Sequence, residues 1–350
     1  MTAQKNDIEI NTEQCPDCIL CGTVGVIVYR DLKDTLFGAP GTWNTMRCPE
    51  CGLFWIDPSP TSEAVGMAYD SYYTHSAKDG GKQRLSSLKK SLSNHVWKRC
   101  YGYRDLIDPS EDLLGRVLSY IPPLKESVGM SIMELNASLR GSILDIGGGN
   151  GDFLSTMRDL GWQVYGVEPD QHAVKYAKEI YNLELHQGTL ENAGFPDSYF
   201  DVVTMNHVIE HVHDPVELVR QCGQILKRGG RLVVVTPNVE SVGHRLFKQF
   251  WRGLEPPRHL HLFSLKTIQQ CAEQAGLNIE HLRTTTRSAR SMFVGNWFLR
   301  KNKSYTNEEI TWPLWISGVI FQFAEEISRK ILKNAGEEIV LVCVKQDDIK

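Results

Sequence analysis

The sequence predicts an α/β protein with a mainly parallel sheet, preceded by a small cysteine-rich head. An apolar strand at 142–146 runs directly into a glycine-rich turn, and further apolar stretches follow at 163–168, 200–205 and 231–235. Strands that alternate with helical segments are typical of a parallel sheet. Five of the nine cysteines lie within the first 51 residues, which sets this part of the chain apart from the rest.

The composition is that of an ordinary soluble enzyme. The 350 residues are 41% hydrophobic and 23% charged, with a formal net charge of -4. This balance argues against bulk electrostatic affinity for nucleic acid, because phosphate binding usually requires a basic domain or stripe. The sequence has no run of about 18 uncharged apolar residues, and its N-terminus is polar. We therefore expect a cytoplasmic location.

The cysteine-rich head is predicted to hold one structural zinc ion. In a cytosolic chain, C-x-x-C pairs separated by a few tens of residues more often bind zinc than form disulfides, and four thiolates leave no open coordination position. The two pairs that are each followed by glycine supply the expected ligands, Cys18, Cys21, Cys48 and Cys51. Cys15 is the alternative ligand, because it also forms a C-x-x-C pair with Cys18.

The turn after the strand at 142–146 has the features of a nucleotide-binding loop. Small residues at Gly147, Gly149 and Gly151 allow the backbone to pass close to a ligand. Asp145 at the strand end can accept hydrogen bonds there, and the next strand ends in Glu168, which is placed to accept from both hydroxyls of a ribose. Together, the two strand ends outline a cofactor site.

The dinucleotide-binding pattern G-x-G-x-x-G is the competing interpretation of this loop. In the present sequence the third glycine comes one residue early, and Asp152 occupies the position at which that pattern has Gly or Ala. A carboxylate there would face a pyrophosphate. A cationic ligand without phosphate therefore suits the loop better.

The pattern D-x-G-x-G-x-G resembles motif I of the class I S-adenosylmethionine-dependent methyltransferases, and Glu168 matches the ribose-binding acid of that family. The runs FDVVTMNHVIEHVHDP and ILKRGGRLVVVTPN resemble the rest of the family's core, so that the resemblance covers about residues 140–280. It points to the branch that contains the ubiquinone-pathway O-methyltransferases and many glycan and natural-product methyltransferases. The run RCPECGLFWIDPSPT resembles the amino-terminal ribbon fused to some glycan and antibiotic-sugar methyltransferases.

The resemblance implies a Rossmann-like sheet that binds S-adenosylmethionine. It divides the chain into a zinc ribbon at 1–60, a helical linker or lid at 61–135 and a methyltransferase domain at 136–350. Within that domain, 241–335 is expected to face the substrate and 338–345 to form the last strand. The expected cofactor-binding residues are Asp145, Gly147, Gly149, Gly151, Glu168, Pro169, Thr189, Leu190, Asn206 and His207.

The expected reaction needs a base if the acceptor is an oxygen, because a hydroxyl must lose its proton as it attacks. A neutral histidine is the natural base near pH 7. The candidates are His211, His259 and His261, and His211 is preferred because it follows the fourth strand, beside the expected methyl group.

Glu210 and His211 also allow an active-site metal, since some relatives bind a divalent cation through a Glu-x-x-Glu-His arrangement. Here His207 replaces the first glutamate, which weakens a magnesium site and favours zinc, iron or manganese. We prefer the alternative in which His211 hydrogen-bonds to its own loop and Glu210 is solvated.

Two helices are predicted from their end signals. One runs from 215 to 226 and ends in the basic turn 227–230, and the other runs from its cap Ser264 to Gly276. Pro122-Pro123 is expected to break a helical stretch at 105–135.

Two further segments allow peripheral membrane contact. Residues 85–99 combine leucines at helical spacing with a basic face, and we expect a cap over the active site in preference to a membrane helix. The aromatic segment 311–323 is too short to span a bilayer, which leaves a core helix or an interfacial contact.

The resemblance implies methylation of a small molecule, or of the sugar of a nucleotide- or lipid-linked glycan, with oxygen as the expected acceptor. One alternative is a zinc-ribbon protein that methylates RNA, but the basic surplus is missing and residues 206–209 lack a base-clamping motif. The other alternative is a noncatalytic cofactor-binding scaffold, which the intact acids Asp145 and Glu168 disfavour. The oligomeric state is left open.

Overall fold

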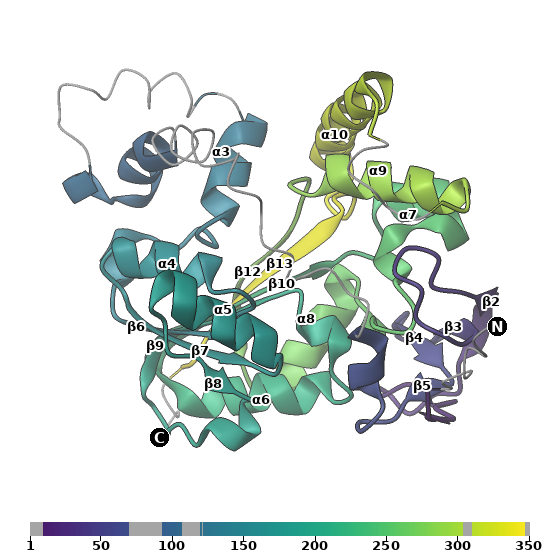
Figure 1. Cartoon of the computed structure of the whole chain (residues 1–350), viewed down its shortest axis with the longest axis horizontal. Helices are drawn as coiled ribbons and strands as arrows, with labels where there is room; N and C mark the ends of the chain where they lie inside the picture. Colours follow the sequence, from purple (N-terminus) through teal and green to yellow (C-terminus); the bar gives the residue numbers. More distant parts are fainter. Residues whose placement is uncertain (1–9, 70–92, 107–119, 121, 304–309, 347–350) are drawn as a thin grey trace, which may run out of the picture.

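A seven-stranded mixed sheet forms the centre of the molecule (Figure 1). The computed structural model describes residues 10–69, 93–106, 120, 122–303 and 310–346. The strand order is β8-β7-β6-β9-β10-β13-β12. The strands comprise β6 (Ser142–Ile146), β7 (Gln163–Glu168), β8 (His186–Gln187), β9 (Phe200–Asn206), β10 (Leu226–Pro237), β12 (Asn278–Thr285) and β13 (Glu338–Val344). The first five are parallel, and β13 runs antiparallel to both β10 and β12.

Alternate residues of the central strands enter two different cores. Ile143 of β6 and Val202 of β9 pack on one face, whereas Leu144 and Val203 pack on the other. Because successive side chains of a strand point to opposite faces, such strands must be apolar throughout when both faces are covered. All five residues of β6 are buried, which explains why this stretch has no polar alternation.

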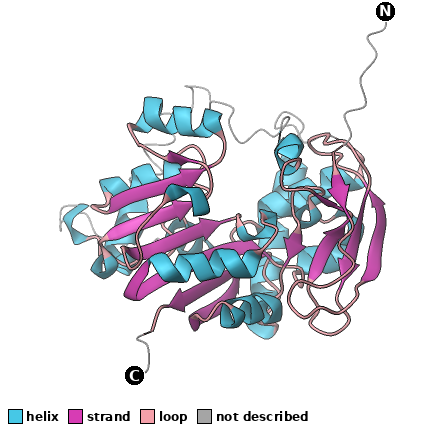
Figure 2. Cartoon of the chain, turned by 90° about the horizontal axis from the view of Figure 1, so that it is seen from below, coloured by secondary structure: helices cyan, strands magenta, loops and turns pink. Residues whose placement is uncertain are grey.

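The helices lie on both faces of this sheet (Figure 2). They comprise α3 (Pro122–Met130), α4 (Asp152–Asp159), α5 (Gln171–Tyr181), α6 (Pro215–Ile225), α7 (Val242–Phe247), α8 (Leu265–Gln274), α9 (Ala289–Arg300) and α10 (Trp312–Ile331). Short 3-10 turns occupy Val65–Tyr69, Arg104–Leu106, Ala137–Leu139, Glu191–Ala193, Ile209–His211, Lys248–Phe250 and Arg252–Leu254. Residues 93–101 are also helical. None of the described helices is long and apolar enough to cross a membrane.

The predicted helix starts are confirmed. Ser264 caps α8 in a capping box with Thr267, and the side chain of Asp214 accepts a hydrogen bond from the backbone of Glu217 at the start of α6. The predicted basic last turn of α6 is wrong: the helix ends at Ile225, and residues 227–230 lie within β10. Strand pairing of Leu226 with Phe200 outweighs the helix-end signal there.

Pro122 and Pro123, the predicted break in a helical stretch, start α3. The first turn of a helix leaves its N–H groups unpaired, so proline costs nothing at this position. Residues 107–119, which belong to the predicted stretch, lie outside the described residues. So does the greater part of the basic segment 85–99, of which 93–99 are described.

The cysteine-rich head is built on a four-stranded antiparallel sheet with the order β11-β4-β3-β2. Its strands are β2 (Val26–Leu32), β3 (Trp43–Arg47), β4 (Phe54–Asp57) and β11 (His261–Leu262), and a separate pair joins β1 (Thr12–Glu13) to β5 (Ser59–Pro60). Strand β11 comes from the second half of the chain, and its His261 pairs with Trp55 of β4. The head sheet is therefore completed by the segment expected to face the substrate.

A buried cation fastens this segment to the head. The side chain of Arg258 has no solvent exposure, and its guanidinium binds Asp34 of the head at 2.9 Å and Glu255 at 3.2 Å. It also donates to the carbonyl of Ala68 at 2.9 Å and lies over the ring of Phe37. Removal of one partner of such a group leaves buried charges uncompensated.

We therefore predict that Arg258→Met lowers the free energy of unfolding by about 3–5 kcal/mol, because Asp34 and Glu255 stay buried without their cation. Chemical denaturation measures this loss. Arg231→Met is the matched control, since Arg231 forms a partly exposed pair with Glu280 and its removal should cost less than about 1 kcal/mol. Equal losses in the two variants would show that Arg258 does not hold the head in place.

Candidate active site

The glycine loop between β6 and α4 adopts the conformation that its sequence predicts. Gly147, Gly149 and Gly151 have φ values of 72°, 52° and 82°, a region that other residues rarely adopt. A Cβ atom at Gly147 would lie 2.5 Å from Val208, so this glycine also lets the loop after β9 approach closely. Gly151 serves packing, since a Cβ there would lie 3.0 Å from Ala177 and Leu183.

Two carboxylates flank this loop. Asp145 at the end of β6 is buried and accepts a hydrogen bond from Thr204 Oγ1 at 2.7 Å. Burial, together with the negative charge of Glu168, raises the pKa of Asp145 to about 7 against the effect of Thr204. Glu168 at the end of β7 accepts from the backbone N–H of Gly149 at 2.8 Å and from that of Asp170 at 2.9 Å. The loop and both strand ends are thus tied into one unit.

A cavity of about 440 Å³ opens over the loop. Its walls come from the loop, from α4, from α3 and the turn after it, from the end of β9 and from the segment after β12. The lining residues are Met130, Ser131, Met133, Asp145, Gly147, Gly148, Gly149, Asn150, Asp152, Phe153, Thr156, Asn206 and Arg287. The volume is in the range of small-ligand sites.

Four of the ten expected cofactor residues line this cavity, namely Asp145, Gly147, Gly149 and Asn206. Glu168 adjoins it through its bond to Gly149. Pro169 and Thr189 are exposed and Leu190 is buried beside them, near the end of β8. The carbonyl of Glu168 accepts from the N–H of Gly188, which keeps this segment next to β7.

His207, expected beside the cofactor, lies between two glutamates. Its Nδ1 is 3.0 Å from Glu210 Oε1 and its Nε2 is 2.8 Å from Glu338 Oε1. Burial disfavours a charge on the ring, but the two carboxylates outweigh it and raise the pKa of His207 to about 10. His207 is therefore a cation at neutral pH. Its backbone has a φ of 57°, in the left-handed region.

The prediction that Glu210 is solvated is wrong. Its side chain has no solvent exposure, and its second oxygen accepts from Thr236 Oγ1 at 2.9 Å. Burial alone would raise the pKa of Glu210, yet the hydrogen bond and charge of His207 lower it to about 2. His207, which replaces the first glutamate of the Glu-x-x-Glu-His arrangement, thus neutralises the charge of Glu210, the second glutamate.

Two of the candidate bases, which come from different loops, lie in contact. His211 and His259 are in edge-to-face contact, with ring centroids 4.7 Å apart. The Nδ1 of His211 lies 2.9 Å from the carbonyl of Arg258, and that of His259 lies 2.7 Å from the carbonyl of Gly253. Because a carbonyl only accepts, both Nδ1 atoms carry the proton, and each Nε2 is the basic nitrogen.

The environment keeps His211 neutral. Burial and the neighbouring His259 lower the pKa of His211 to about 4, although Glu210 and Glu255 act in the opposite direction. Ligand atoms of Glu210, His211 and His259 lie within 4.8 Å of one another, so a metal at this place would take His259 in addition to the expected pair. None of the three residues is among those that line the cavity.

His261 occupies a different environment. Its Nε2 donates to the carbonyl of His213 at 3.2 Å, while its Nδ1 is buried without a partner. Burial lowers the pKa of His261 to about 4. As part of β11 it connects the head sheet to the loop after β9, and His213 extends this connection with a bond from its Nε2 to the carbonyl of Pro60 at 2.8 Å.

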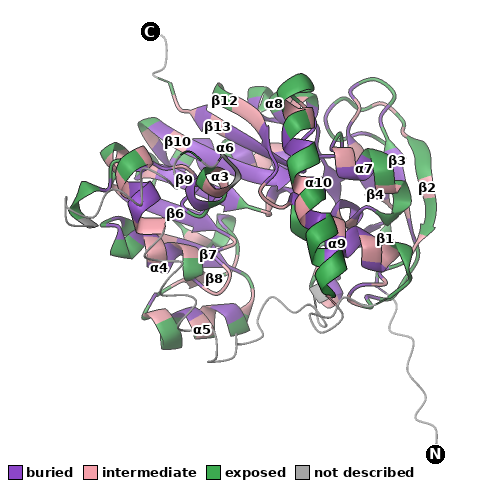
Figure 3. Ribbon diagram, turned by 90° about the horizontal axis from the view of Figure 1, so that it is seen from above, coloured by how far each residue is buried: buried purple, intermediate pink, exposed green. Residues whose placement is uncertain are grey.

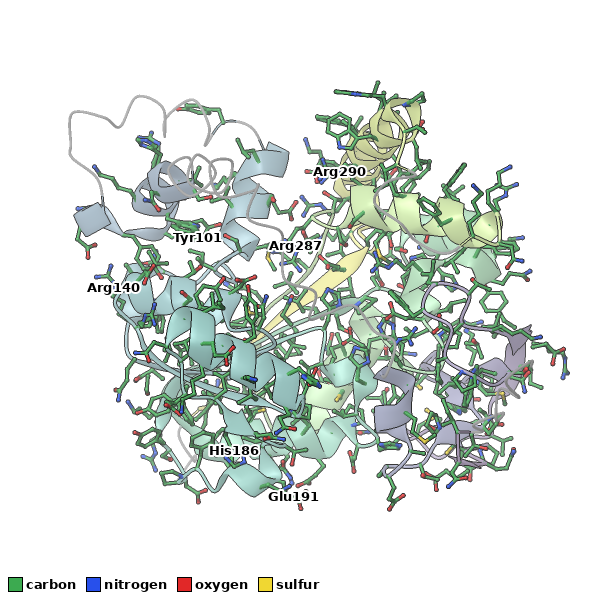
Figure 4. The ribbon with its side chains drawn as sticks, in the orientation of Figure 1. Tyr101, Arg140, His186, Glu191, Arg287 and Arg290 are labelled. Atoms are coloured by element: carbon green, nitrogen blue, oxygen red, sulfur yellow. The ribbon has the colours of Figure 1, made fainter. Side chains whose placement is uncertain are left out.

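Sequence reasoning missed Arg287, which lies at the rim of the cavity (Figure 4). Its guanidinium donates to both oxygens of Glu338 at 3.2 Å and to Asn206 Oδ1 at 3.1 Å. Glu338 starts the last strand and stands opposite Pro237 and Thr285 in the sheet register. The acidic pair at 337–338, directly before an apolar strand, was the only sequence signal for this network.

The four expected cysteine ligands converge in the head. The sulfurs of Cys18 and Cys51 are 3.4 Å apart, as are those of Cys21 and Cys48, and all four lie within 4.8 Å of one another. A tetrahedral Zn–S distance of about 2.3 Å places sulfurs about 3.8 Å apart, which is close to this arrangement. Cys15 is outside the group, and its backbone N–H donates to Asp57.

The backbone around these cysteines supports the choice of pairs. Gly22 and Gly52, which follow the second cysteine of each pair, have φ values of 71° and 91°. Burial opposes ionisation of Cys48, but hydrogen bonds from the Cys51 backbone and from Cys21 outweigh it and lower the pKa of Cys48 to about 6. A thiolate is the form that binds a metal.

Known proteins resemble part of this chain. Residues 113–282 match the model of a family described as a methyltransferase domain. A ubiquinone biosynthesis O-methyltransferase from Yersinia pestis is 40% identical over 102 residues, which cover 27% of the chain and 42% of the relative. A probable S-adenosylmethionine-dependent methyltransferase from Mycobacterium tuberculosis is 35% identical over 97 residues, covering 27% of the chain and 35% of the relative. The chain thus spans less than half the length of these curated relatives.

Among solved structures, a methyltransferase dependent on S-adenosylmethionine from Archaeoglobus fulgidus matches 59% of this chain and 86% of its own, with a TM-score of 0.40 and 20% identity. The family match, the names of the relatives and the strand order that places the glycine loop at the carboxyl end of β6 agree with one another. Over residues 113–282 the chain is therefore similar to methyltransferase domains.

Proposed function

We propose that the whole chain is an S-adenosylmethionine-dependent methyltransferase that methylates an oxygen of a small molecule or of a sugar in a nucleotide- or lipid-linked glycan. The observation that carries the proposal is the cavity lined by the glycine loop, the start of α4 and Asn206 at the end of β9, with Asp145 and Glu168 at adjacent strand ends. Some relatives in sequence are ubiquinone biosynthesis O-methyltransferases, which makes an oxygen acceptor the first choice.

The residues around the cavity fit the donor. Asp145 and Glu168 are 5% and 8% exposed, so each carboxylate interacts strongly with a cation that enters beside it. When bound, S-adenosylmethionine supplies an activated methyl group on a positively charged sulfur. The chain's own residues bind the donor and align its methyl group with the acceptor. Alignment is sufficient for transfer, so no covalent intermediate with the protein is needed. Glu168 would hold the ribose, because its carboxylate stands at the end of β7 against the glycine loop, where it accepts from the backbone of Gly149.

The acceptor is placed on the side of the loop after β9. His211 receives the acceptor proton at Nε2, because its Nδ1 is fixed by the carbonyl of Arg258. His259 supports it from the adjoining segment. Two cations, His207 and Arg287, balance the two carboxylates of Glu210 and Glu338 in this region. Cys18, Cys21, Cys48 and Cys51 would hold a zinc ion in the head, where four thiolates would leave it a structural role.

The first prediction concerns the donor. Glu168→Ala should lower the affinity for S-adenosylmethionine by roughly 2–4 kcal/mol, because two charge-assisted bonds to the ribose are lost. Isothermal titration calorimetry measures the change, and Glu184→Ala is the control, since Glu184 is an exposed partner of Lys178. Unchanged affinity in Glu168→Ala, or stronger binding of NAD than of S-adenosylmethionine, would refute the cofactor assignment.

A second prediction concerns the head. Elemental analysis should find about one zinc per chain, as expected for a closed site of four thiolates. Cys48→Ser should release the metal and lower the melting temperature, whereas Cys15→Ser should keep both. Zinc loss in Cys15→Ser without loss in Cys21→Ser would mean that the ligand set is wrong.

The third prediction identifies the base. His211→Gln should lower kcat by about 10²–10⁴ while donor affinity is kept, because general-base catalysis acts in the transition state. Because only the neutral imidazole accepts a proton and the pKa of His211 is about 4, kcat should stay level from pH 8 to about pH 5 and fall below it.

Discontinuous assays with an identified acceptor measure the loss in kcat and its pH dependence, and His261→Gln is the comparison. Full turnover in each of the His211, His259 and His261 variants would exclude these histidines as the base. It would also refute the proposal that the acceptor is a hydroxyl oxygen. Full donor binding without transfer to any acceptor class would favour the noncatalytic scaffold.

A further inference from the structure

One helix presents an unusual amount of apolar surface. Along α10, large hydrophobic side chains recur every three or four residues and are exposed, and Figure 3 shows green, exposed residues along the length of this helix. They are between 41% and 78% exposed and comprise Trp312, Trp315, Ile316, Ile320, Phe323, Ile327 and Ile331, with Leu332 just beyond the helix. The largest apolar patch of a typical soluble monomer is only about 300–600 Å². A patch that runs the length of a 20-residue helix needs an occupant.

The opposite face of α10 is fixed to the protein, which leaves the apolar face outward. Leu314 packs with Phe298 and Val294 of α9, and Phe321 stacks on Phe293. Farther along, Gln322 donates to the carbonyl of Thr286 at 3.0 Å, and Arg329 donates to that of Thr284 at 3.0 Å. The helix cannot turn its apolar side inward without breaking these contacts.

Positive charge borders the apolar face. Arg290 lies over the ring of Trp315 at 5.4 Å, Arg300 and Lys301 are exposed where α9 ends, and Lys330 and Lys333 are exposed at the other end of α10. Helix α9 contains no acidic residue, and the two acids of α10, Glu325 and Glu326, are 0% and 7% exposed. Among the described residues of these two helices, every exposed charge is therefore positive.

From this combination we propose that the outer face of α10 is a docking surface for an anionic lipid bilayer, along which the helix lies with its apolar side chains in the headgroup boundary. An amphipathic helix with tryptophan on its apolar side and cations at its border is typical of interfacial binding. Attraction of the basic border to anionic lipid adds to the burial of apolar surface. The proposal is independent of the methyl-transfer reaction.

The charges of the described residues in α9 and α10 favour lipid over a second copy of the chain. In a two-fold antiparallel pairing of α10 helices, Arg300 and Lys301 of one copy would face Lys330 and Lys333 of the other. No exposed carboxylate of the described α9 and α10 is available to pair with them. Like charges at close range oppose such a dimer, whereas anionic lipid satisfies both ends at once.

Vesicle sedimentation with the full chain tests the proposal. Wild-type protein should bind phosphatidylcholine vesicles that contain phosphatidylserine at low ionic strength, with weaker binding at high salt and to pure phosphatidylcholine. The double variant I320E/I327E should bind at least about tenfold more weakly, since two inserted side chains become charged. Ile180→Glu is the matched control, because Ile180 is 57% exposed on α5 and should leave binding unchanged.

A charge variant separates electrostatic attraction to the lipid from the burial of apolar side chains. K330E/K333E should weaken binding to the anionic vesicles about tenfold or more and leave binding to neutral vesicles unchanged. Thermal melting and zinc content must match the wild type in each variant, which excludes misfolding as the cause.

Absence of binding to anionic vesicles at low ionic strength would overturn the proposal, as would equal binding by wild type and I320E/I327E. A dimer in sedimentation equilibrium that I320E/I327E converts to a monomer would also overturn it and assign the face to a second copy. Methyl transfer is measured separately, so failure of the docking surface leaves the proposed reaction unaffected.

Discussion

The buried guanidinium of Arg258 is the interaction on which the arrangement of the active site depends. Its side chain is held by Asp34 in the cysteine-rich head, and its own carbonyl fixes the ring of His211. The neighbouring strand β11 completes the head sheet, and the backbone N–H of Leu260 donates to the carbonyl of Glu210. The head, the base candidate and the sheet therefore share one short segment. A buried ion pair adds little net stability but fixes geometry, which is its contribution here.

A second constraint lies at the carboxyl ends of the central strands. Three strands deliver charged side chains to this edge, and the pairs formed by His207, Glu210, Glu338 and Arg287 neutralise one another. Asp145 and Glu168 stand on the other side of the glycine loop, where they accept hydrogen bonds from Thr204 and from the backbone of Gly149 and Asp170. The edge is thus divided into a region that holds two cations with two acids and a region that presents acids beside the cavity. This division agrees with a sulfonium donor and an uncharged acceptor group.

Local patterns in the sequence predicted the local parts of this site. The glycine loop, the acid at the end of β7, each of the two C-x-x-C pairs and the starts of α6 and α8 are patterns of residues within a few positions of one another. The network around Glu338 did not follow from the sequence, because it joins residues 131 positions apart that meet only through the register of β10, β12 and β13. The pair of Arg258 and Asp34 spans 224 positions for the same reason. Glu210 was expected in solvent because nothing next to it in sequence showed that Thr236 donates a hydrogen bond to its carboxylate.

The central claim is that the cavity over the glycine loop is the donor site and faces the loop after β9. Hydrogen–deuterium exchange with and without S-adenosylhomocysteine, the demethylated donor, tests this most directly. The account predicts slower exchange at 145–151 and 167–170, where the ligand would bind, with a smaller effect at 206–211 and none in the cysteine-rich head. Protection confined to other segments, or no protection at saturating ligand, would contradict it.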